Sequence, residues 1–322
     1  MIRKFFKLAL ILSCALTCSL ALARIEFATP ISKDAAKMWS NTNSPLKCIL
    51  SYSFKDIGRA DFITYAGAEL NKTGLFLNFK LGVLKNTKMR VIANRPEWQS
   101  GNQEEYLGEI KMYQGFVPFI GPSLTWEILT NLNRGRQILL PFEGLRSVNS
   151  QLIIPVISPL GFKAKMREFQ NCTSKLLRVN YNDISLLPLI FEYRSTEFDK
   201  QTKAYLDNLI AYVLADKSVN KVEIKAFAED MDSRQGNLDL SLKRVNSVAQ
   251  YLENNGINKD FIVKKELNPL TLSKDSYYQK EHRDIQFRKG LITLGRNQDL
   301  VDPNLELDAF PDVGNPNFKF HD

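Results

Sequence analysis

Hydrophobic and polar residues alternate through much of the segment from Arg24 to about Lys175, and this pattern predicts a domain made mainly of β-strands. In the clearest stretch, Leu75, Leu77, Phe79 and Leu81 alternate with Phe76, Asn78 and Lys80. A two-residue period puts one set of side chains on each face of a strand, so this stretch should be half-buried. Four further short strands are expected: Met89–Ala93, Gly108–Met112, Gln137–Phe142 and Gln151–Ile157.

One stretch of this segment has helical spacing instead. Leu124, Ile128 and Leu132 are four residues apart, and Gly135 follows where such a helix would end. Gly and Pro residues punctuate the strands, as at Gly121-Pro122. Short strands with one or two helices predict a β-sandwich or a barrel. We assign this fold to an N-terminal domain of residues 24–175.

After Cys172 the pattern changes to alternating strands and helices, which predicts a second domain over residues 180–295. The expected elements are a strand at Leu189–Tyr193, a helix at Gln201–Ala215, a strand containing Val222, Ile224 and Ala226, a helix at about Leu238–Asn254, and strands at Phe261–Leu267 and Asp284–Phe287. The order βαβαββ is typical of a mixed sheet with helices on one face, an α/β sandwich.

The last segment, residues 296–322, is acidic, contains three prolines and has no sustained period. This composition predicts an extended or disordered tail. A docking peptide is the alternative, because Leu305, Leu307 and Phe310 could each anchor in an apolar groove.

The first residues resemble a secretory signal peptide. Arg3, Lys4 and Lys7 precede an apolar run that ends in Ala21-Leu22-Ala23. We expect cleavage after Ala23, so that residues 1–23 are removed and the mature chain lies in the periplasm of a Gram-negative bacterium. An uncleaved anchor is the alternative, and Thr17 before Cys18 argues against a lipoprotein.

Net charge bears on the possible partners, and cysteine content bears on a possible disulfide. The formal net charge is +8, and removing the signal peptide would lower it to about +5, which does not indicate a nucleic-acid partner. Cys48 and Cys172 would be the two cysteines that remain, and in an oxidising compartment we expect them to pair. Closing so long a loop is worth about 4–5 kcal/mol in the chain-entropy model.

A motif in the second domain points to a ligand. Asn237, Leu240, Ser241 and Arg244 form the pattern Asn-x-x-Leu-Ser-x-x-Arg, and Glu229 lies eight residues before Asn237. This pattern resembles the signature of OmpA-like peptidoglycan-binding domains. The later family pattern Asn-Arg-x-Val is matched by His282, Arg283, Asp284 and Ile285. The resemblance covers roughly Leu186 to Lys289.

The resemblance implies that this domain binds the diaminopimelate of the peptidoglycan stem peptide. That group carries an ammonium beside a carboxylate, so its recognition needs one anion and one cation at close range. Glu229 would bind the ammonium, and Arg244 would bind the carboxylate through two parallel N–H bonds. Asn237 would cap the helix or brace the loop, and Arg283 would complete the site.

This sequence departs from the OmpA-like pattern at two positions. The family's acid is an aspartate, whereas Glu229 is longer by one methylene, and Asp232 replaces the family's glycine. Asp230 could take the role of Glu229 if the loop is one residue shorter. The alternative is that Glu229 and Arg244 form an ordinary surface ion pair, worth about 0–1 kcal/mol.

The N-terminal domain resembles the MotY family of sodium-driven flagellar motor proteins. The resemblance rests on an ordered set of residues: Thr29-Pro30, Trp39, Pro45-Leu46-Lys47-Cys48, Gly58, Ala60, Phe62, Ala66-Gly67 and Arg95-Pro96-Glu97-Trp98. It implies a ring protein of the basal body that works with MotX to steady the stator units, with Cys48 and Cys172 as a disulfide. The plainer interpretation of Trp39, Trp98 and Trp126 is core packing.

Two other functions remain open. One is a general wall-anchoring protein without a flagellar role, which would share the second domain alone. The other is an enzyme, which we do not expect because His282 and His321 are the only histidines and no Gly-rich phosphate loop or nucleophile motif is present. No cofactor or metal is implied.

Overall fold

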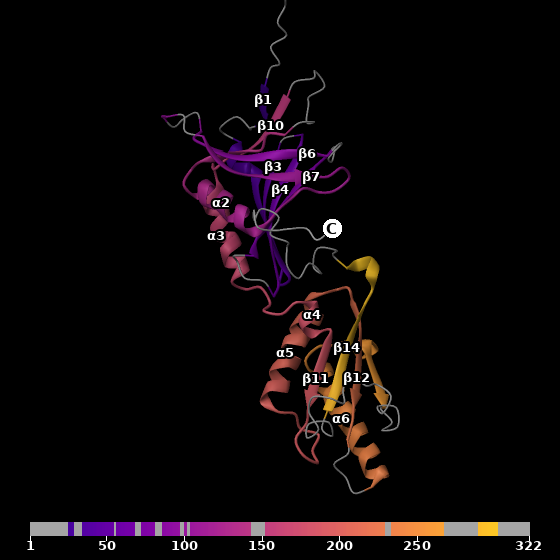
Figure 1. Cartoon of the computed structure of the whole chain (residues 1–322). Helices are drawn as coiled ribbons and strands as arrows, with labels where there is room; N and C mark the ends of the chain where they lie inside the picture. The colour runs from indigo at the N-terminus through magenta and orange to yellow at the C-terminus, as the bar shows by residue number, and fades with distance from the viewer. Residues whose placement is uncertain are drawn as a thin grey trace, which may run out of the picture.

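In the computed structural model the strands and helices form two groups, drawn in the upper and lower halves of Figure 1. The structure describes residues 25–28, 34–54, 56–67, 72–80, 86–96, 100–101, 104–142, 152–228, 233–266 and 289–301. The expected signal peptide at residues 1–23 and most of the expected tail lie outside these ranges.

The N-terminal group contains two five-stranded sheets. In the first the strand order is β2-β3-β4-β5-β8: Trp39–Asn43, Lys47–Phe54, Gly58–Tyr65, Gly74–Phe79 and Phe119–Ile120. In the second it is β1-β10-β9-β6-β7: Ile25–Ala28, Leu152–Ile157, Gln137–Leu139, Thr87–Asn94 and Glu105–Met112. Neighbouring strands in both sheets run antiparallel, except that β1 and β10 run parallel. This arrangement confirms the expected mainly-β domain.

Both sheets contribute to one core, together with helices α2 (Pro122–Asn133) and α3 (Phe162–Thr173). In β3 the alternation is plain, because Leu50 and Tyr52 are fully buried while the intervening Ser51 is less buried. Trp39 lies in this core against the rings of Tyr52, Phe62 and Phe162. Core packing is thus confirmed for Trp39, whereas Trp98 lies outside the described residues.

The expected strands and the first helix of this domain are present, but several elements were missed. Each of the five expected strand segments contains a strand, and α2 covers the expected helix. Strands β1 to β4, the short strand β8 and helix α3 were not predicted. In α3 the apolar residues Phe162, Met166, Phe169 and Cys172 do have helical spacing. This spacing was overlooked because polar residues outnumber the apolar residues in α3 and because the helix directly follows a Pro-Leu-Gly turn.

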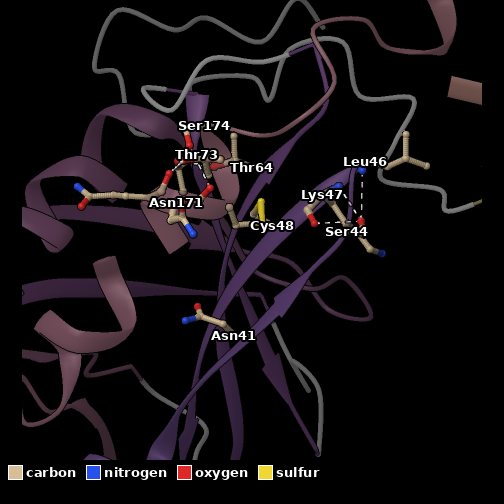
Figure 2. Close-up of a disulfide and its surroundings, with 12 residues drawn as sticks. Asn41, Ser44, Leu46, Lys47, Cys48, Thr64, Thr73, Asn171 and Ser174 are labelled. Atoms are coloured by element: carbon tan, nitrogen blue, oxygen red, sulfur yellow. Dashed lines mark hydrogen bonds between the residues drawn. A yellow bond between two sulfur atoms is a disulfide. The ribbon is translucent and has the colours of Figure 1, made fainter. Parts of the chain in front are cut away.

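The expected disulfide joins β3 to α3 (Figure 2). Cys48 and Cys172 are separated by 124 residues in the chain, and their Cα atoms are 6.0 Å apart. Cys48 is fully buried and faces Thr64 on the neighbouring strand β4. Thr64 in turn shares a buried hydrogen bond of 2.7 Å with Thr73. The bridge therefore fastens α3 to β3, an inner strand of the first sheet.

The second domain has the expected βαβαββ order. Its elements are β11 (Leu186–Ile190), α5 (Lys200–Ala215), β12 (Val219–Ala226), α6 (Arg234–Asn254), β13 (Ile262–Glu266) and β14 (Lys289–Arg296). The strand order is β11-β14-β12-β13, with β12 and β13 parallel and β14 antiparallel to both of its neighbours. Apolar residues of both helices and of the strands share one core, so the helices cover the same face of the sheet.

Two strand positions of this domain differ from expectation. The first strand begins three residues earlier than predicted, at Leu186. The last strand, β14, begins at Lys289 and was not predicted, while the strand expected at Asp284–Phe287 lies outside the described residues. Gly290 and Gly295 lie in β14. Their low strand propensity explains why this segment was overlooked.

The segment between the domains is fastened to the first domain at Leu177. The N–H of Leu177 donates to Pro45 O at 3.0 Å, and the N–H of Gly67 donates to Leu177 O at 2.9 Å. Gly67 has φ +76°, and a Cβ there would meet Asn180 at 3.0 Å, so this close approach requires glycine. Leu46 and Ala66 of the first domain pack against the core of the second domain.

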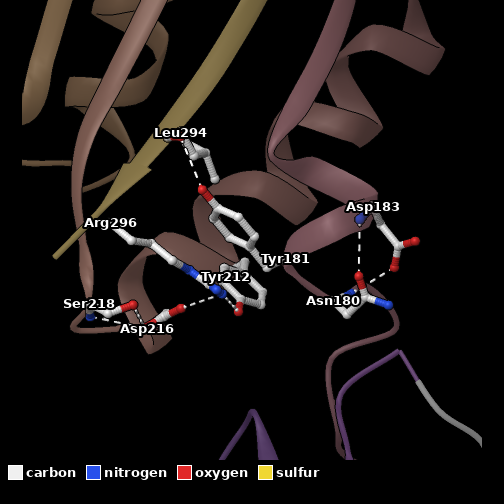
Figure 3. A network of polar contacts seen from close by, with 8 residues as sticks. All are labelled: Asn180, Tyr181, Asp183, Tyr212, Asp216, Ser218, Leu294 and Arg296. Atoms are coloured by element: carbon white, nitrogen blue, oxygen red, sulfur yellow. Dashed lines mark hydrogen bonds and ion pairs between the residues drawn. The ribbon is translucent and has the colours of Figure 1, made fainter. Parts of the chain in front are cut away.

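Beyond this contact, Tyr181 ties the linker to the last strand (Figure 3). Its hydroxyl donates to Leu294 O at 3.1 Å, and the guanidinium of Arg296 stacks 3.3 Å from its ring centre. Arg296 also donates to Asp216 at 3.0 Å and to the hydroxyl of Tyr212 at 2.6 Å. Burial raises the pKa of Tyr212, with a further contribution from the charge of Asp216.

Candidate functional site

The residues expected to bind a ligand lie where the carboxyl end of β12 meets the amino end of α6. β12 ends at Ala226 and is followed by the buried residues Phe227 and Ala228. The next described residue is Ser233. Its hydroxyl accepts a hydrogen bond from Gly236 N at 3.0 Å and so caps α6. A helix amino end carries a partial positive charge.

One face of α6 carries the motif found in the sequence. Asn237, Ser241 and Arg244 are spaced by four and three residues, so they lie on the same side of the helix. Ser241 is buried, and its hydroxyl donates to Leu238 O at 2.8 Å. Leu240 is also buried, and Val245 packs in the core of the domain. The spacing thus serves two purposes, since it seats the helix and aims Arg244 at the carbonyl of Phe227, just beyond the end of β12.

Arg244 is fully buried, and its guanidinium contacts three backbone carbonyls. Nη1 donates to Phe227 O at 2.9 Å, Nε donates to Ser195 O at 2.9 Å, and Nη2 donates to Glu192 O at 3.2 Å. The guanidinium carbon also lies 5.0 Å from the ring centre of Phe191. Arg244 therefore joins α6, the end of β12 and the loop after β11.

This arrangement places a permanent positive charge under the site. An arginine side chain does not lose its proton in a protein, so burial cannot neutralise it. The three carbonyl dipoles offset part of the cost of burying the charge. Together with the amino end of α6, the guanidinium makes this end of the sheet favourable for anions.

The structure describes two of the five predicted site residues. Asn237 and Arg244 lie on one face of α6, whereas Glu229, Asp230 and Arg283 lie outside the described residues. The prediction that Asn237 caps the helix is wrong, because Ser233 does so and Asn237 follows one turn later. The helix begins four residues before the predicted start because Ser233 provides this cap.

The loop after β11 also belongs to this region, and the sequence analysis missed it. It supplies two of the carbonyls bound by Arg244, and its Thr196 O accepts from Ser247 of α6 at 3.2 Å. Tyr193 in this loop is 64% exposed, with the guanidinium of Arg194 5.5 Å from its ring centre. In the sequence, the tyrosine followed directly by an arginine was the available signal for this loop, since backbone carbonyls have no sequence signature.

Among the residues described, His, Cys, Asp and Glu side chains nowhere gather in a group of three that could hold a metal ion. Within the same part of the chain, no helix is both long and apolar enough to span a membrane.

Comparison with known proteins assigns both domains. Residues 28–178 match the MotY N-terminal domain, and residues 190–275 match the OmpA family. The sodium-type flagellar protein MotY of Vibrio parahaemolyticus serotype O3:K6 is 25% identical to this chain over 221 residues. That alignment covers 68% of this chain and 74% of the relative.

Solved structures resemble about a third of the chain. The OmpA-like domain of FopA1 from Francisella tularensis is 18% identical, with a TM-score of 0.29 over 34% of this chain and 72% of that one. The peptidoglycan-associated lipoprotein from Burkholderia pseudomallei is 18% identical, with a TM-score of 0.28 over 34% and 89%. The periplasmic domain of Helicobacter pylori MotB is 14% identical, with a TM-score of 0.28 over 35% and 83%. From the two family matches, the chain consists of a MotY N-terminal domain followed by a C-terminal domain of the OmpA family.

Proposed function

We propose that this protein is a non-enzymatic periplasmic component of a flagellar motor that binds peptidoglycan through its C-terminal domain. The observation that carries the proposal is the buried Arg244 at the junction of β12 and α6, in a domain that follows a MotY N-terminal domain. The domain bounds that we propose are residues 24–175 and 180–295, after removal of a signal peptide at residues 1–23.

The ligand chemistry follows from the charges at this junction. The diaminopimelate of the stem peptide offers an ammonium and a carboxylate on one carbon. The positive charge of Arg244 and the amino end of α6 favour the carboxylate. A protein carboxylate must then bind the ammonium, and Glu229 or Asp230 would supply it. Arg283 would add a second cation, and Asn237 would brace the loop.

Covalent geometry supports Glu229 as the acid. Phe227, whose carbonyl is bound by Arg244, precedes Glu229 by two residues. Two residues span at most about 7 Å, so covalent geometry allows Glu229 to lie near the point that Arg244 holds. Because Arg244 is fully buried and bound to backbone carbonyls, we assign it a positioning role as well as an electrostatic one.

Replacing Glu229 with glutamine should weaken binding to peptidoglycan at least tenfold. The amide keeps the size of the side chain but cannot pair with the stem-peptide ammonium through a full negative charge. The measurement is co-sedimentation of the mature chain with insoluble sacculi across a range of protein concentrations. Glu229→Asp should retain binding, since it restores the family's acid.

Glu253→Gln is the matched control, because Glu253 is exposed near the far end of α6 and carries the same charge. This variant should sediment like the unaltered protein. Equal sedimentation of Glu229→Gln and Glu253→Gln would remove Glu229 from the site, and Asp230→Gln would then test the neighbouring acid. Soluble fragments released from the sacculi during the assay would contradict the non-enzymatic assignment.

The motor role rests on the N-terminal domain. We propose that this domain meets a MotX-like protein and other ring proteins of the basal body, and that the whole chain steadies the stator complex. The support is the match to the MotY N-terminal domain and to a flagellar relative. A general wall anchor would need the C-terminal domain alone.

Deleting the gene should abolish swimming while growth and cell shape remain normal. The readout is swimming speed and the fraction of motile cells, with restoration by the unaltered gene as the control. If the deleted strain swims normally but its envelope is weakened, the protein is a general wall anchor and the motor role is wrong.

A further inference from the structure

A groove of about 360 Å³ lies between α2 and α3, which pack together on one side of the N-terminal domain (Figure 1). The groove is lined by the apolar side chains of Trp126, Leu129, Phe162 and Met166, which form its floor, and by the polar side chains of Thr130, Asn133 and Gln170. Leu129, Phe162 and Met166 also belong to the domain core, so the floor is held in place by packing on its inner side. The groove is therefore a fixed feature of this surface.

Two cations stand on the rim of the groove. Lys163 and Arg167 are both exposed and lie four residues apart, so they share one side of α3. Lys165 differs from them, because it is paired with Glu168 at 2.9 Å. Lys163 and Arg167 take part in no ion pair or side-chain hydrogen bond with any described residue. Their charge is thus available to an anionic partner.

The indole of Trp126 adds a hydrogen-bond donor. Its Nε1 is buried beside the groove and has no acceptor among the described residues. A buried donor without a partner is unfavourable, and a small outward tilt of the ring would let it meet an oxygen of a bound chain. The groove therefore combines apolar and polar side chains, two cations and one donor, which suits an acidic peptide that also carries apolar side chains.

We propose that this groove binds the acidic C-terminal segment of the same chain, residues 302–322. That segment contains Leu305, Leu307 and Phe310, with Glu306 and Asp308 between them. In an extended chain successive side chains point in opposite directions. The two leucines can then face the apolar floor while the carboxylates rise toward the cations on the rim.

The length of the segment permits this contact. Its 21 residues span about 70 Å when extended, whereas a domain of about 150 residues has a radius of gyration of about 15 Å. From Val301, a segment of this length is long enough to extend across a domain of that size.

The test uses a fluorescent peptide of residues 302–322 and a mature chain that ends at Val301. The peptide should bind this shortened chain in an anisotropy titration, and should bind the full chain at least tenfold more weakly because its own tail fills the groove. Binding should fall at least tenfold in Lys163→Glu/Arg167→Glu. It should be unchanged in the charge-matched control Lys200→Glu/Lys203→Glu, which alters exposed residues of α5.

A peptide with Leu305→Ser and Leu307→Ser keeps its charge and should lose binding, which separates docking on the floor from simple charge attraction. The thermal unfolding of each protein variant should match that of the unaltered chain, because the changed residues are exposed. The proposal is overturned if the peptide does not bind the shortened chain, or if it binds the groove variant and the control variant equally. Equal binding to the full and shortened chains would overturn occupancy of the groove by the chain's own tail.

Discussion

Replacing Arg244 with alanine should destabilise the C-terminal domain by about 3–5 kcal/mol, and peptidoglycan binding should be lost because the end of β12 and the loop after β11 are no longer held together. The change leaves the carbonyls of Glu192, Ser195 and Phe227 without the donor that now binds them. Buried groups without partners are costly, and the truncation also opens a cavity beside Phe191. The loss is a large part of the total stability of a domain of this size.

Thermal unfolding followed by circular dichroism measures this effect, with sedimentation on sacculi assayed below the transition. The expected fall in melting temperature is about 10–20 °C. Lys243→Ala is the control, because this neighbour is exposed and should change stability by less than about 0.5 kcal/mol. An Arg244→Ala protein with an unchanged melting temperature that no longer sediments would contradict the positioning role and favour direct contact with the ligand.

Removing the disulfide should cost the N-terminal domain about 5 kcal/mol. The bridge closes a loop of 124 residues, and in the chain-entropy model most of its effect comes from restricting the unfolded chain. Cys48→Ala/Cys172→Ala is preferable to serine substitutions, because Cys48 is fully buried and a hydroxyl there would need a partner. The measurement is urea-induced unfolding of the mature chain.

The unaltered chain treated with dithiothreitol is the internal comparison, and it should unfold at about the same urea concentration as the double alanine variant. Dithiothreitol should leave the alanine variant unchanged, since Cys14 and Cys18 would be removed with the signal peptide. If reduction does not shift the unfolding midpoint, the bridge is not a source of stability. Loss of this bridge should also loosen α3, and with it one wall of the groove between α2 and α3.

Local patterns in the sequence predicted a large part of the fold. The two-residue period marks strands such as β5, and the spacing of Leu206, Leu209, Ile210 and Val213 marks one face of α5. The pairing of Cys48 with Cys172 followed from the compartment and from the number of cysteines. These features depend on residues close together in the chain or on covalent chemistry, and both can be read from the sequence alone.

Other features depended on contacts between distant segments. β14 lies between β11 and β12, although it is the last strand of the domain and follows β13 in the chain. Its glycines gave it little strand propensity, so the hydrogen bonds of its two neighbours determine its conformation. Asn237 was expected as a helix cap, but the cap is Ser233, since the start of α6 was set by the turn and not by the apolar period.

The site shows the same division between local and distant information. The sequence by itself determined that Asn237, Ser241 and Arg244 share a helix face, because that follows from their spacing. Only the tertiary structure decided what Arg244 does, since its partners are carbonyls 17, 49 and 52 residues away. Every residue has a backbone carbonyl, so no side-chain pattern could have predicted which three would surround this guanidinium.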